Sequence, residues 1–535
     1  MQREKKSWIT AALLILFISL CVTFYCQIPL LTNEFAINED SRQVIYFYPR
    51  FQEAFFFKND PITEVVSRFN PYGVSAFYFI IGIFLDPLKF TKILPFITCA
   101  ISAIFMFKLG SRLRNQRTAF LSGLIFIFIS WSRRGFEFFG TGDGADFSIP
   151  LTIIFLYYVI GRNFGKSFII LFLLSFFYPP LFLICALTLA ITLVSGTFDS
   201  GPGSGKRKRL LMLAAVLAIF FIPLLKYSDN KLALVDLAQM KGMEEFYPGG
   251  RMPVFFPSLY LQLTNQYSGI ALDYTLKWLL IISITLALLL KKESLNIPAA
   301  LWNFCLSSFS FFILAYIFMY RLSGPARYMR YSFPVFLILF IALNTDKLLE
   351  KIKPVLLRHA ALGAALLFIC LSFIPALRRY FVIAPYPGLY RFISSLPQDA
   401  LIAGHPMLMN DIPPFSKKRV FISEETSLPY YKDFYPVIRK RTYDFFDIYY
   451  SGSLEKIYAF CRDSGITHLV VNKNHFSSGY FASGKFYLNP FNKHILDLVR
   501  ERPASFALMQ VPQGRKVFEE GDIFVIETKS LDNDP

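Results

Sequence analysis

Two short acidic clusters hold the side chains of this chain that are best suited to chemistry. Glu39 and Asp40 follow the first hydrophobic segment, and Asp143 and Asp146 lie in the glycine-rich stretch 140–146 between two later ones. Carboxylates beside a bilayer are costly and are read as functional by default. A carboxylate at such a low-dielectric boundary can act as a general base towards a hydroxyl group, and oxygen-rich clusters suit Mg²⁺ or Mn²⁺.

Each acidic cluster also has an ordinary structural interpretation. The loop around Asp40 could be solvated, with its acids paired to Arg42 and Arg50, and Arg42 could instead pair with Asp40 or hold a phosphate. Asp146 is placed to cap a helix over 147–160, whereas Asp143 has no comparable role. We expect Asp40 to be the better candidate for a base, with Glu39 as its flanking neighbour.

A third cluster alternates arginine with tyrosine in the segment 321–331. It contains Arg327, Tyr328, Arg330 and Tyr331. Arginine binds phosphate through two parallel hydrogen bonds, and tyrosine is enriched at membrane interfaces. The cluster predicts a site for a lipid-linked phosphate or diphosphate. The alternative is an aromatic belt with arginines paired to lipid headgroups.

Composition indicates that hydrophobic helices position these residues. The 535 residues are 54% hydrophobic and only 17% charged, with a mean hydropathy of +0.45. Repeated apolar runs near bilayer length predict a polytopic α-helical membrane protein. The net charge of +18 comes from Lys and Arg in short loops between the apolar runs. We interpret them as topology signals and contacts for membrane lipids, which argues against nucleic-acid binding.

Hydropathy predicts about eleven spans, and the pair around residues 178–180 could be one kinked segment. An apolar stretch at 72–85 is short enough to lie along the membrane surface, and this choice places every basic loop in the cytoplasm. The N-terminus is then cytoplasmic, and the loops 30–70, 132–146, 226–273 and 321–331 lie outside. The predicted spans are Trp8–Cys26, Ile93–Lys108, Ala119–Trp131, Phe147–Ile160, Ser167–Phe177, Leu181–Val194, Leu210–Leu225, Leu276–Leu290, Pro298–Tyr320, Ser332–Leu343 and Ala360–Ile374.

The chain divides into a transmembrane domain over 1–384 and an extracytoplasmic soluble α/β domain over 385–535. Short buried strands are predicted at 400–404, 419–423 and 467–472, with helices at 389–396 and 453–464. Residues 506–511 and 522–528 are expected to form a closing antiparallel pair. His405 is expected to be structural, despite Asp411 nearby.

The order of these features resembles the GT-C superfamily of integral-membrane glycosyltransferases. The resemblance rests on the acidic segment 39–42, the interfacial stretch 72–85, the basic turn 108–117, the second acidic loop and the outer α/β domain. More narrowly, the chain looks like the bacterial relatives of protein O-mannosyltransferases and of lipid A aminoarabinose transferase, which implies a bacterial inner-membrane location. The Trp-Trp-Asp-Tyr-Gly signature of oligosaccharyltransferase catalytic subunits is absent, which argues against N-glycan transfer.

The resemblance implies a hexosyl- or pentosyltransferase that uses a sugar carried on polyprenyl phosphate. Asp40 would be the catalytic base with Glu39 beside it, and Asp40, Asp143 and Asp146 would be the metal ligands of a metal-dependent member. Arg42 and the pairs Arg327-Tyr328 and Arg330-Tyr331 would bind the substrate phosphate. A glycan, lipid or protein would be the acceptor, with inversion at the sugar. The rival functions are a transporter or flippase for a lipid-linked glycan and a non-catalytic glycan-assembly scaffold.

Overall fold

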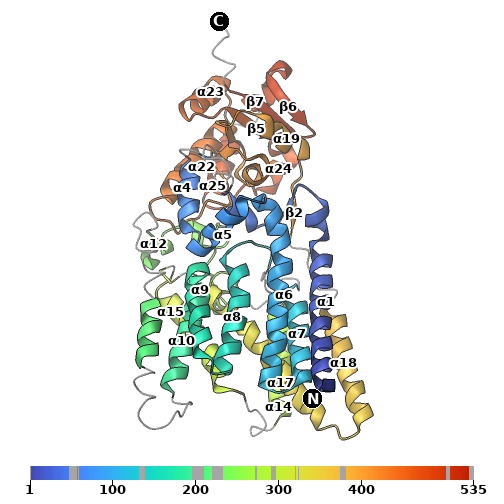
Figure 1. Ribbon diagram of the computed structural model, residues 1–535. Helices are drawn as coiled ribbons and strands as arrows, with labels where there is room; N and C mark the ends of the chain where they lie inside the picture. The colour runs from blue at the N-terminus through green and yellow to red at the C-terminus, as the bar shows by residue number, and fades with distance from the viewer. Residues whose placement is uncertain are drawn as a thin grey trace.

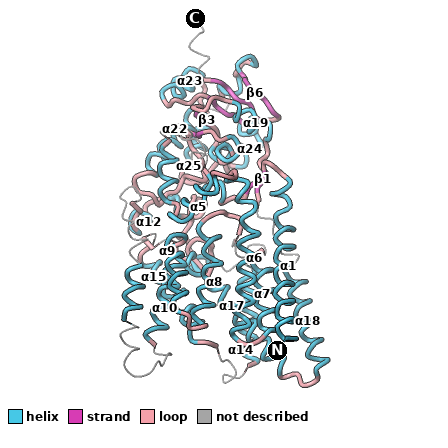
Figure 2. Tube along the Cα trace, viewed as in Figure 1, coloured by secondary structure: helices cyan, strands magenta, loops and turns pink. Residues whose placement is uncertain are grey.

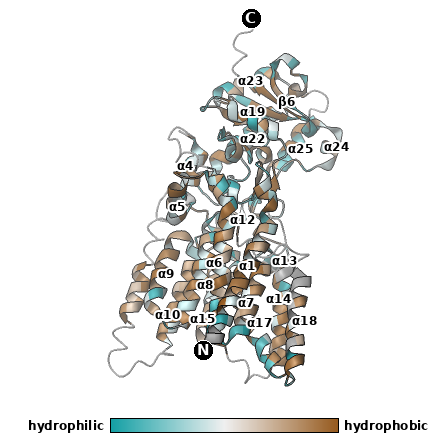
Figure 3. Cartoon of the chain, turned by 45° about the vertical axis from the view of Figure 1, so that its right-hand side comes forward, coloured by the Kyte–Doolittle hydropathy of each residue, from teal (hydrophilic) through white to brown (hydrophobic). Residues whose placement is uncertain are grey.

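A long helical bundle carries a smaller sheet-containing region at one end (Figure 1). The computed structural model describes residues 2–46, 48, 57, 60–131, 139–195, 210–219, 233–270, 274–290, 297–319, 321–322, 324–373, 381–501 and 506–528. Strands gather in the C-terminal region and near its junction with the bundle, as Figure 2 shows. The bundle helices are richer in hydrophobic residues than the C-terminal region is (Figure 3).

Every predicted span falls on a helix of the bundle over its described residues, and residues 220–225, 320 and 374 of these spans lie outside them. Among the described residues, four helical segments are long and apolar enough to cross a membrane, namely Lys6–Thr32, Pro87–Leu113, Ala299–Ile317 and Ala326–Glu350, and eight more apolar helices are shorter. The helices are α1 (Gln2–Thr32), α6 (Pro87–Leu113), α7 (Gln116–Ser130), α8 (Gly144–Ile160), α9 (Phe164–Phe177), α10 (Pro179–Val194), Leu210–Ile219, α14 (Tyr274–Leu289), α15 (Ala299–Ile317), α17 (Phe333–Glu350) and α18 (Val355–Phe373).

Short elements connect the bundle to the C-terminal region. They are β1 (Ala36–Ile37), α2 (Ser41–Ile45), α4 (Pro61–Phe69), α5 (Tyr72–Gly82), α12 (Leu237–Lys241), α13 (Leu259–Thr264) and α16 (Ala326–Arg330). The stretch predicted to lie on the membrane surface forms α5, which packs against α9 at the junction (Figure 1). Tyr178, in extended backbone, separates α9 from α10, so the structure has two helices there rather than one kinked helix.

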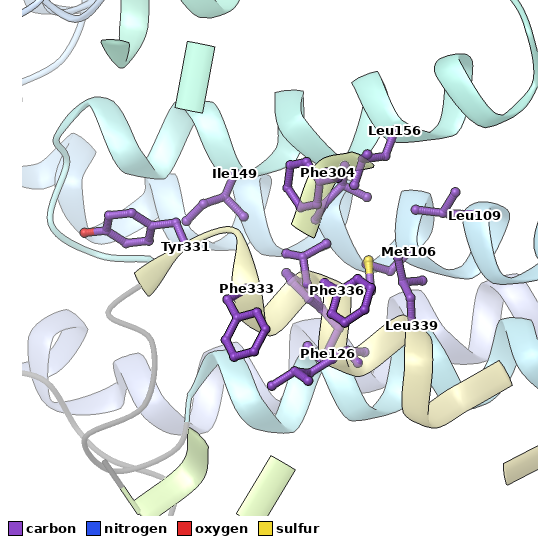
Figure 4. Close-up of a cluster of buried hydrophobic side chains, with 14 of the residues drawn as sticks. Met106, Leu109, Phe126, Ile149, Leu156, Phe304, Tyr331, Phe333, Phe336 and Leu339 are labelled. Atoms are coloured by element: carbon purple, nitrogen blue, oxygen red, sulfur yellow. The ribbon is translucent and has the colours of Figure 1, made fainter. Parts of the chain in front are cut away.

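Side chains cap the turns that join the bundle helices. Asn115 accepts a hydrogen bond from Thr118 N at the start of α7, and Asn163 accepts one from Lys166 N at the start of α9. Each cap favours the start of a new helix after a basic turn, because the capping side chain accepts from a backbone N–H that has no partner within the helix. Apolar side chains from α6, α7, α8, α15 and α17 then fill the space between the helices (Figure 4).

The basic turns 108–117, 162–166 and 347–358 lie at the end of the bundle where the chain begins, and the basic stretches 206–209 and 291–292 lie outside the described residues. Ser7 Oγ is 3.2 Å from Gln116 Oε1, and Arg114 Nε is 2.9 Å from Asp346 Oδ2 at the end of α17. Arg112 donates to the Tyr157 carbonyl near the end of α8. The acidic loops and the C-terminal region lie at the other end (Figure 1). The sequence predicted this grouping, and which end faces the cytoplasm stays a prediction.

The C-terminal region is built on a five-stranded mixed sheet in the order β4-β3-β5-β7-β6. β3 pairs in parallel with β4 and β5, whereas β7 is antiparallel to β5 and β6. The elements are β2 (Val382–Ile383), α19 (Pro387–Ser395), β3 (Leu401–Ala403), α20 (Pro406–Met409), α21 (Ile412–Ser416), β4 (Arg419–Val420), α22 (Tyr435–Tyr449), α23 (Leu454–Asp463), β5 (His468–Asn472), α24 (Ser478–Ser483), α25 (Phe491–Glu501), β6 (Lys516–Glu520) and β7 (Ile523–Glu527).

The predicted closing strand pair is wrong in one partner. Residues Ala507–Gln510 form a 3-10 helix, and the strand beside β7 is β6. The segment 506–511 is apolar because Phe506, Ala507 and Leu508 are buried in the core of the C-terminal region, not because it alternates like a strand. An apolar run this short does not by itself distinguish a strand from a helix.

One hydrophobic cluster joins the C-terminal region to the first loop. Phe35, Ile37 and Tyr48 pack in the same cluster as Leu389 and Val525. The first loop is therefore packed on the C-terminal region as well as attached to the bundle.

Candidate functional site

The first acidic loop begins at a short sheet that ties it to the C-terminal region. β1 pairs antiparallel with β2, with Ala36 opposite Ile383 and Ile37 opposite Val382. Asn38 follows and is buried, whereas Glu39 and Asp40 are exposed. The Asp40 N–H donates to Asn38 Oδ1 at 3.2 Å, and α2 starts at the next residue. The two acids thus lie on a turn that is fixed on both sides.

The second acidic loop is organised around its own carboxylates. Asp146 is fully buried and accepts hydrogen bonds from Gly140 N at 3.0 Å, Gly142 N at 2.8 Å and the Thr141 hydroxyl at 3.2 Å. Both glycines have positive φ, which a glycine adopts without the steric cost other residues meet. Asp146 is therefore occupied in folding the loop.

Asp143, rather than Asp146, caps the following helix. Its Oδ1 atom accepts from Ala145 N at 2.8 Å and from the Thr141 hydroxyl at 2.9 Å, at the start of α8. The sequence predicted the cap at Asp146 and no such role for Asp143, so the two are exchanged. The reason is that the helix starts at Gly144, which puts Asp146 inside the first turn, facing back to the loop.

The two acidic loops touch directly. The Ser41 hydroxyl lies 3.0 Å from the carbonyl oxygen of Gly140 and 2.9 Å from that of Thr141, and Ser41 is fully buried. Because Ser41 follows Asp40 and Thr141 is two residues before Asp143, the structure brings both predicted clusters to one place.

Arg327 lies beside the second acidic loop. It is exposed on the short helix α16 and interacts electrostatically with Asp143 and with the hydroxyls of Tyr178, Tyr331 and Tyr430. Within the part of the chain that the structure describes, its guanidinium makes no salt bridge. A cation in this position is available for an anionic ligand.

The other members of the arginine–tyrosine cluster have different surroundings. Tyr328 is buried, its ring stacks on Phe311, and its hydroxyl donates to the Leu322 carbonyl. Arg330 lies over the ring of Tyr331, with 5.9 Å between the guanidinium carbon and the ring centroid. The Tyr331 side chain lies at the edge of the bundle core (Figure 4). Tyr328 thus packs the bundle, and Arg327 is the member that faces the acidic loop.

A compact loop over 233–270 connects this arginine to the C-terminal region. Its Tyr267 carbonyl accepts from Ala326 N at 3.4 Å, next to Arg327. Its Arg251 lies 3.0 Å from a carboxylate oxygen of Glu425 and 3.5 Å from one of Glu424. Burial raises the pKa of the Tyr267 phenol, and nearby Arg251 opposes this while Asp40 and Glu425 add to it. Tyr267 therefore lies within electrostatic range of Asp40.

Arg42 forms an ion pair with a carboxylate of the C-terminal region, and its role in binding a phosphate stays a prediction. Its Nη2 atom is 2.7 Å from Asp411 Oδ1, and both side chains are buried. Burial raises the pKa of Asp411, and the charge of Arg42 opposes that shift. Asp411 thus does not form a pair with His405, whose Nε2 is 3.1 Å from the Phe486 carbonyl oxygen. Arg50, the other cation expected in this loop, lies outside the described residues.

The predicted three-carboxylate metal site does not fit the arrangement. The carboxylate of Asp146 accepts hydrogen bonds from the loop, and Oδ1 of Asp143 accepts one at the start of α8. Among the described residues, no group of three or more His, Cys, Asp or Glu side chains is suited to a metal. We therefore derive no chemical step through a metal.

Sequence reasoning missed the residues that the C-terminal region contributes. Glu424, Glu425 and Tyr430 belong to a loop after β4, and Tyr267 belongs to the loop after α13. The only signal was an acidic pair inside the stretch 420–431, which begins with apolar residues and ends with two tyrosines. Nothing local indicates that this pair meets Arg251.

Comparison with known proteins places the fold. No protein-family model matches this chain, and no curated protein sequence matches it. A solved structure of the Archaeoglobus fulgidus oligosaccharyltransferase, tethered to an acceptor peptide containing the NVT sequon, has a TM-score of 0.50 at 11% identity, covering 92% of this chain and 72% of that one. The same enzyme in complex with Zn and sulfate has a TM-score of 0.50 at 12% identity, covering 91% and 70%.

The chain has a GT-C fold. The structural similarity extends over almost the whole chain, so it includes both the bundle and the C-terminal region. The fold that the chain shares with this oligosaccharyltransferase agrees with the resemblance seen in the sequence, whereas the narrower likeness to O-mannosyltransferase and aminoarabinose transferase relatives stays a prediction. At this identity the similarity concerns the fold alone.

Proposed function

We propose that this GT-C protein transfers a sugar from a polyprenyl-phosphate-linked donor to a hydroxyl group of an acceptor. The observation that carries the proposal is the grouping of an exposed carboxylate, Asp40, with an exposed guanidinium, Arg327, around one compact loop. Burial raises the pKa of the Tyr267 phenol, and the charge of Asp40 adds to this shift. The Tyr267 carbonyl accepts a hydrogen bond from Ala326 N, and Ala326 precedes Arg327. A base and an anion-binding cation are the two groups that this transfer needs.

The chemistry follows from the two charges. Asp40 accepts the proton of the acceptor hydroxyl. The oxygen of that hydroxyl attacks the anomeric carbon from the face opposite the phosphate. The bond between that carbon and the phosphate oxygen breaks, and polyprenyl phosphate leaves with an added negative charge. Arg327 stabilises this charge through hydrogen bonds that are already oriented. The product glycoside has inverted configuration.

The cellular placement is part of the proposal. The basic turns lie at the end of the bundle where the chain begins, and short loops rich in Lys and Arg favour the cytoplasmic side. The site would then lie on the outer face of a bacterial inner membrane. A carrier lipid in the outer leaflet could present its phosphate to Arg327 and Arg330 at that boundary.

Two features bear on the acceptor. The archaeal structure holds a peptide with an NVT sequon, whereas the present chain lacks the Trp-Trp-Asp-Tyr-Gly signature. A hydroxyl of a glycan, lipid or protein therefore fits the proposal better than an asparagine side chain. A flippase would move the carrier lipid without forming a glycoside, and a scaffold would do neither.

Transfer in proteoliposomes tests the proposal. The purified protein is supplied with radiolabelled undecaprenyl-phosphate sugars and a membrane extract as acceptor. We expect Asp40→Asn to abolish transfer while Glu244→Gln, at an exposed acid of the 233–270 loop, leaves it intact. Full transfer by Asp40→Asn would refute the assignment of the base.

Binding of the leaving group tests the phosphate site without knowledge of the sugar. Native mass spectrometry measures undecaprenyl phosphate bound to the protein in detergent. We expect Arg327→Ala to weaken binding about tenfold or more, as the loss of a charge-assisted hydrogen bond to phosphate implies. Arg500→Ala, at an exposed arginine of α25, serves as the control. Equal affinity of the two variants would remove the phosphate site.

A further inference from the structure

The segment that carries Asp40 is held from the C-terminal region by two successive side chains. Arg42 forms its ion pair with Asp411, and Gln43 donates from Nε2 to the Glu425 carbonyl at 2.8 Å. Only 9% of the Arg42 side chain and 6% of the Asp411 side chain are exposed. The pair thus lies between two regions that are distant in the sequence.

Asp411 is itself fixed before it meets Arg42. It lies between α20 and α21, next to Asn410, whose Oδ1 accepts from the Ser423 hydroxyl at 2.8 Å and from Glu425 N at 3.0 Å. These bonds connect the α20–α21 turn to the loop that also holds Gln43. Asp411 therefore presents a carboxylate at a position that the C-terminal region has already set.

A buried guanidinium needs a carboxylate partner. Removing one member of a buried ion pair leaves an uncompensated charge. Because such a charge is costly, the remaining group is more stable when it pairs with another group of opposite charge. The acids nearest to Arg42 along its own segment are Glu39 and Asp40, three and two residues before it. Paired with a guanidinium, a carboxylate becomes a weaker base, because an opposite charge lowers its pKa.

We propose that Asp411 is a positioning residue for Asp40: it binds Arg42 so that Arg42 does not pair with the base. This inference rests on the proposed function, since it needs Asp40 to act as a base. In it, the C-terminal region completes the active site without touching the substrate. The charged groups in this neighbourhood are Glu39 and Arg42 on the segment of Asp40, and Arg251 and Glu425 on the loops beside it. The Tyr267 phenol interacts electrostatically with Asp40, Arg251 and Glu425, and Glu425 interacts with Glu39 and Arg42.

Two substitutions and a control test the inference in the transfer assay. Asp411→Asn should lower kcat about tenfold or more with the KM for the donor changed less than about twofold, because the phosphate site is untouched. Lys417→Gln removes another ion pair of the C-terminal region, 3.2 Å long with Asp86 at the start of α6, and should leave both constants unchanged. Asp411→Glu keeps the charge and should recover part of kcat.

The pH profile separates positioning from a merely structural role. If Arg42 turns to Asp40 in Asp411→Asn, the acid limb of the kcat profile moves to lower pH by about one unit. The double variant Arg42→Gln with Asp411→Asn removes the guanidinium. The acid limb of its kcat profile should then return to the wild-type pH, and its kcat should exceed that of Asp411→Asn alone. The neutral pair also keeps the double variant folded, since both charges are replaced together.

The outcomes distinguish this inference from the proposed function. A fully active Asp40→Asn variant would contradict the proposed function. An inactive Asp40→Asn together with an Asp411→Asn variant that behaves like Lys417→Gln would overturn only the role of Asp411. A slow Asp411→Asn variant that Arg42→Gln fails to rescue would overturn it as well.

Discussion

Acidification should destabilise the C-terminal region through His405. The ring is almost fully buried, and it packs against His475, with ring centroids 4.5 Å apart, and against Phe446. Burial lowers the pKa of His405 from 6.5 to about 4, and the Phe486 carbonyl opposes this shift. The unfolded chain therefore binds a proton below pH 6.5 that the folded chain does not bind until about pH 4.

The size of the effect follows from this window. Stability from the neutral ring is fully present above about pH 6.5 and is lost as pH falls towards 4. At pH 5 the pH lies about 1.5 units below the pKa of the ring in the unfolded chain, so protonation favours the unfolded state. The free energy of unfolding falls by about 2 kcal/mol. For a unit the size of residues 381–528, this loss corresponds to a fall in Tm of about 4–8 °C.

Melting of the full-length protein in detergent at pH 7.5 and pH 5 measures this loss. Because other groups titrate in the same range, the informative quantity is the difference in Tm shift between wild type and His405→Phe. The variant should lose about 4–8 °C less on acidification. His494→Gln, at a partly exposed histidine paired with Asp447, should melt like wild type. Equal acid sensitivity in His405→Phe and wild type would refute the reasoning.

Three further outcomes are expected. Gly142→Ala should lower stability by about 1–2 kcal/mol, because φ is +71° and the added Cβ would lie 2.3 Å from a buried tyrosine hydroxyl; unchanged melting would contradict this. Asp346→Asn should cost about 2 kcal/mol, measured by melting, since two arginines at 2.9 Å would lose their buried partner. In intact cells, a membrane-impermeant thiol reagent should label Glu39→Cys and not Lys351→Cys; the reverse pattern would invert the topology.

The helices could be predicted from sequence better than their roles as spans. Each predicted span is helical over its described residues, because long apolar runs in a membrane need internally paired backbone groups. The number of spans is a different matter, since in the described part of the chain four helices reach the length of a bilayer and the other apolar helices are shorter. The strands β3, β5 and β7 were predicted from local apolar runs, whereas three of the five residues of β6 are charged and gave no such run.

The site was predictable in its chemistry and not in its pairing. The sequence indicated acids and arginines in loops beside the membrane, and the structure brings the two acidic loops together next to Arg327. Their roles in chemistry stay a prediction. The sequence offered no means to see that Arg42 pairs with Asp411, because 368 residues lie between them in the sequence. The exchange between Asp143 and Asp146 has a smaller cause, a helix that begins one turn earlier than expected.

The pairing of β1 with β2 sets an order of assembly for the molecule. Residues 36–43 find their partners at 382–383, 411 and 425, so the first loop cannot take its final shape until most of the chain has been synthesised. Contacts this distant in sequence form slowly, because a long loop must close before they stabilise anything. A chain that stops before β2 could therefore still form the bundle helices, but the turn that carries Asp40 would lack the C-terminal half of its support.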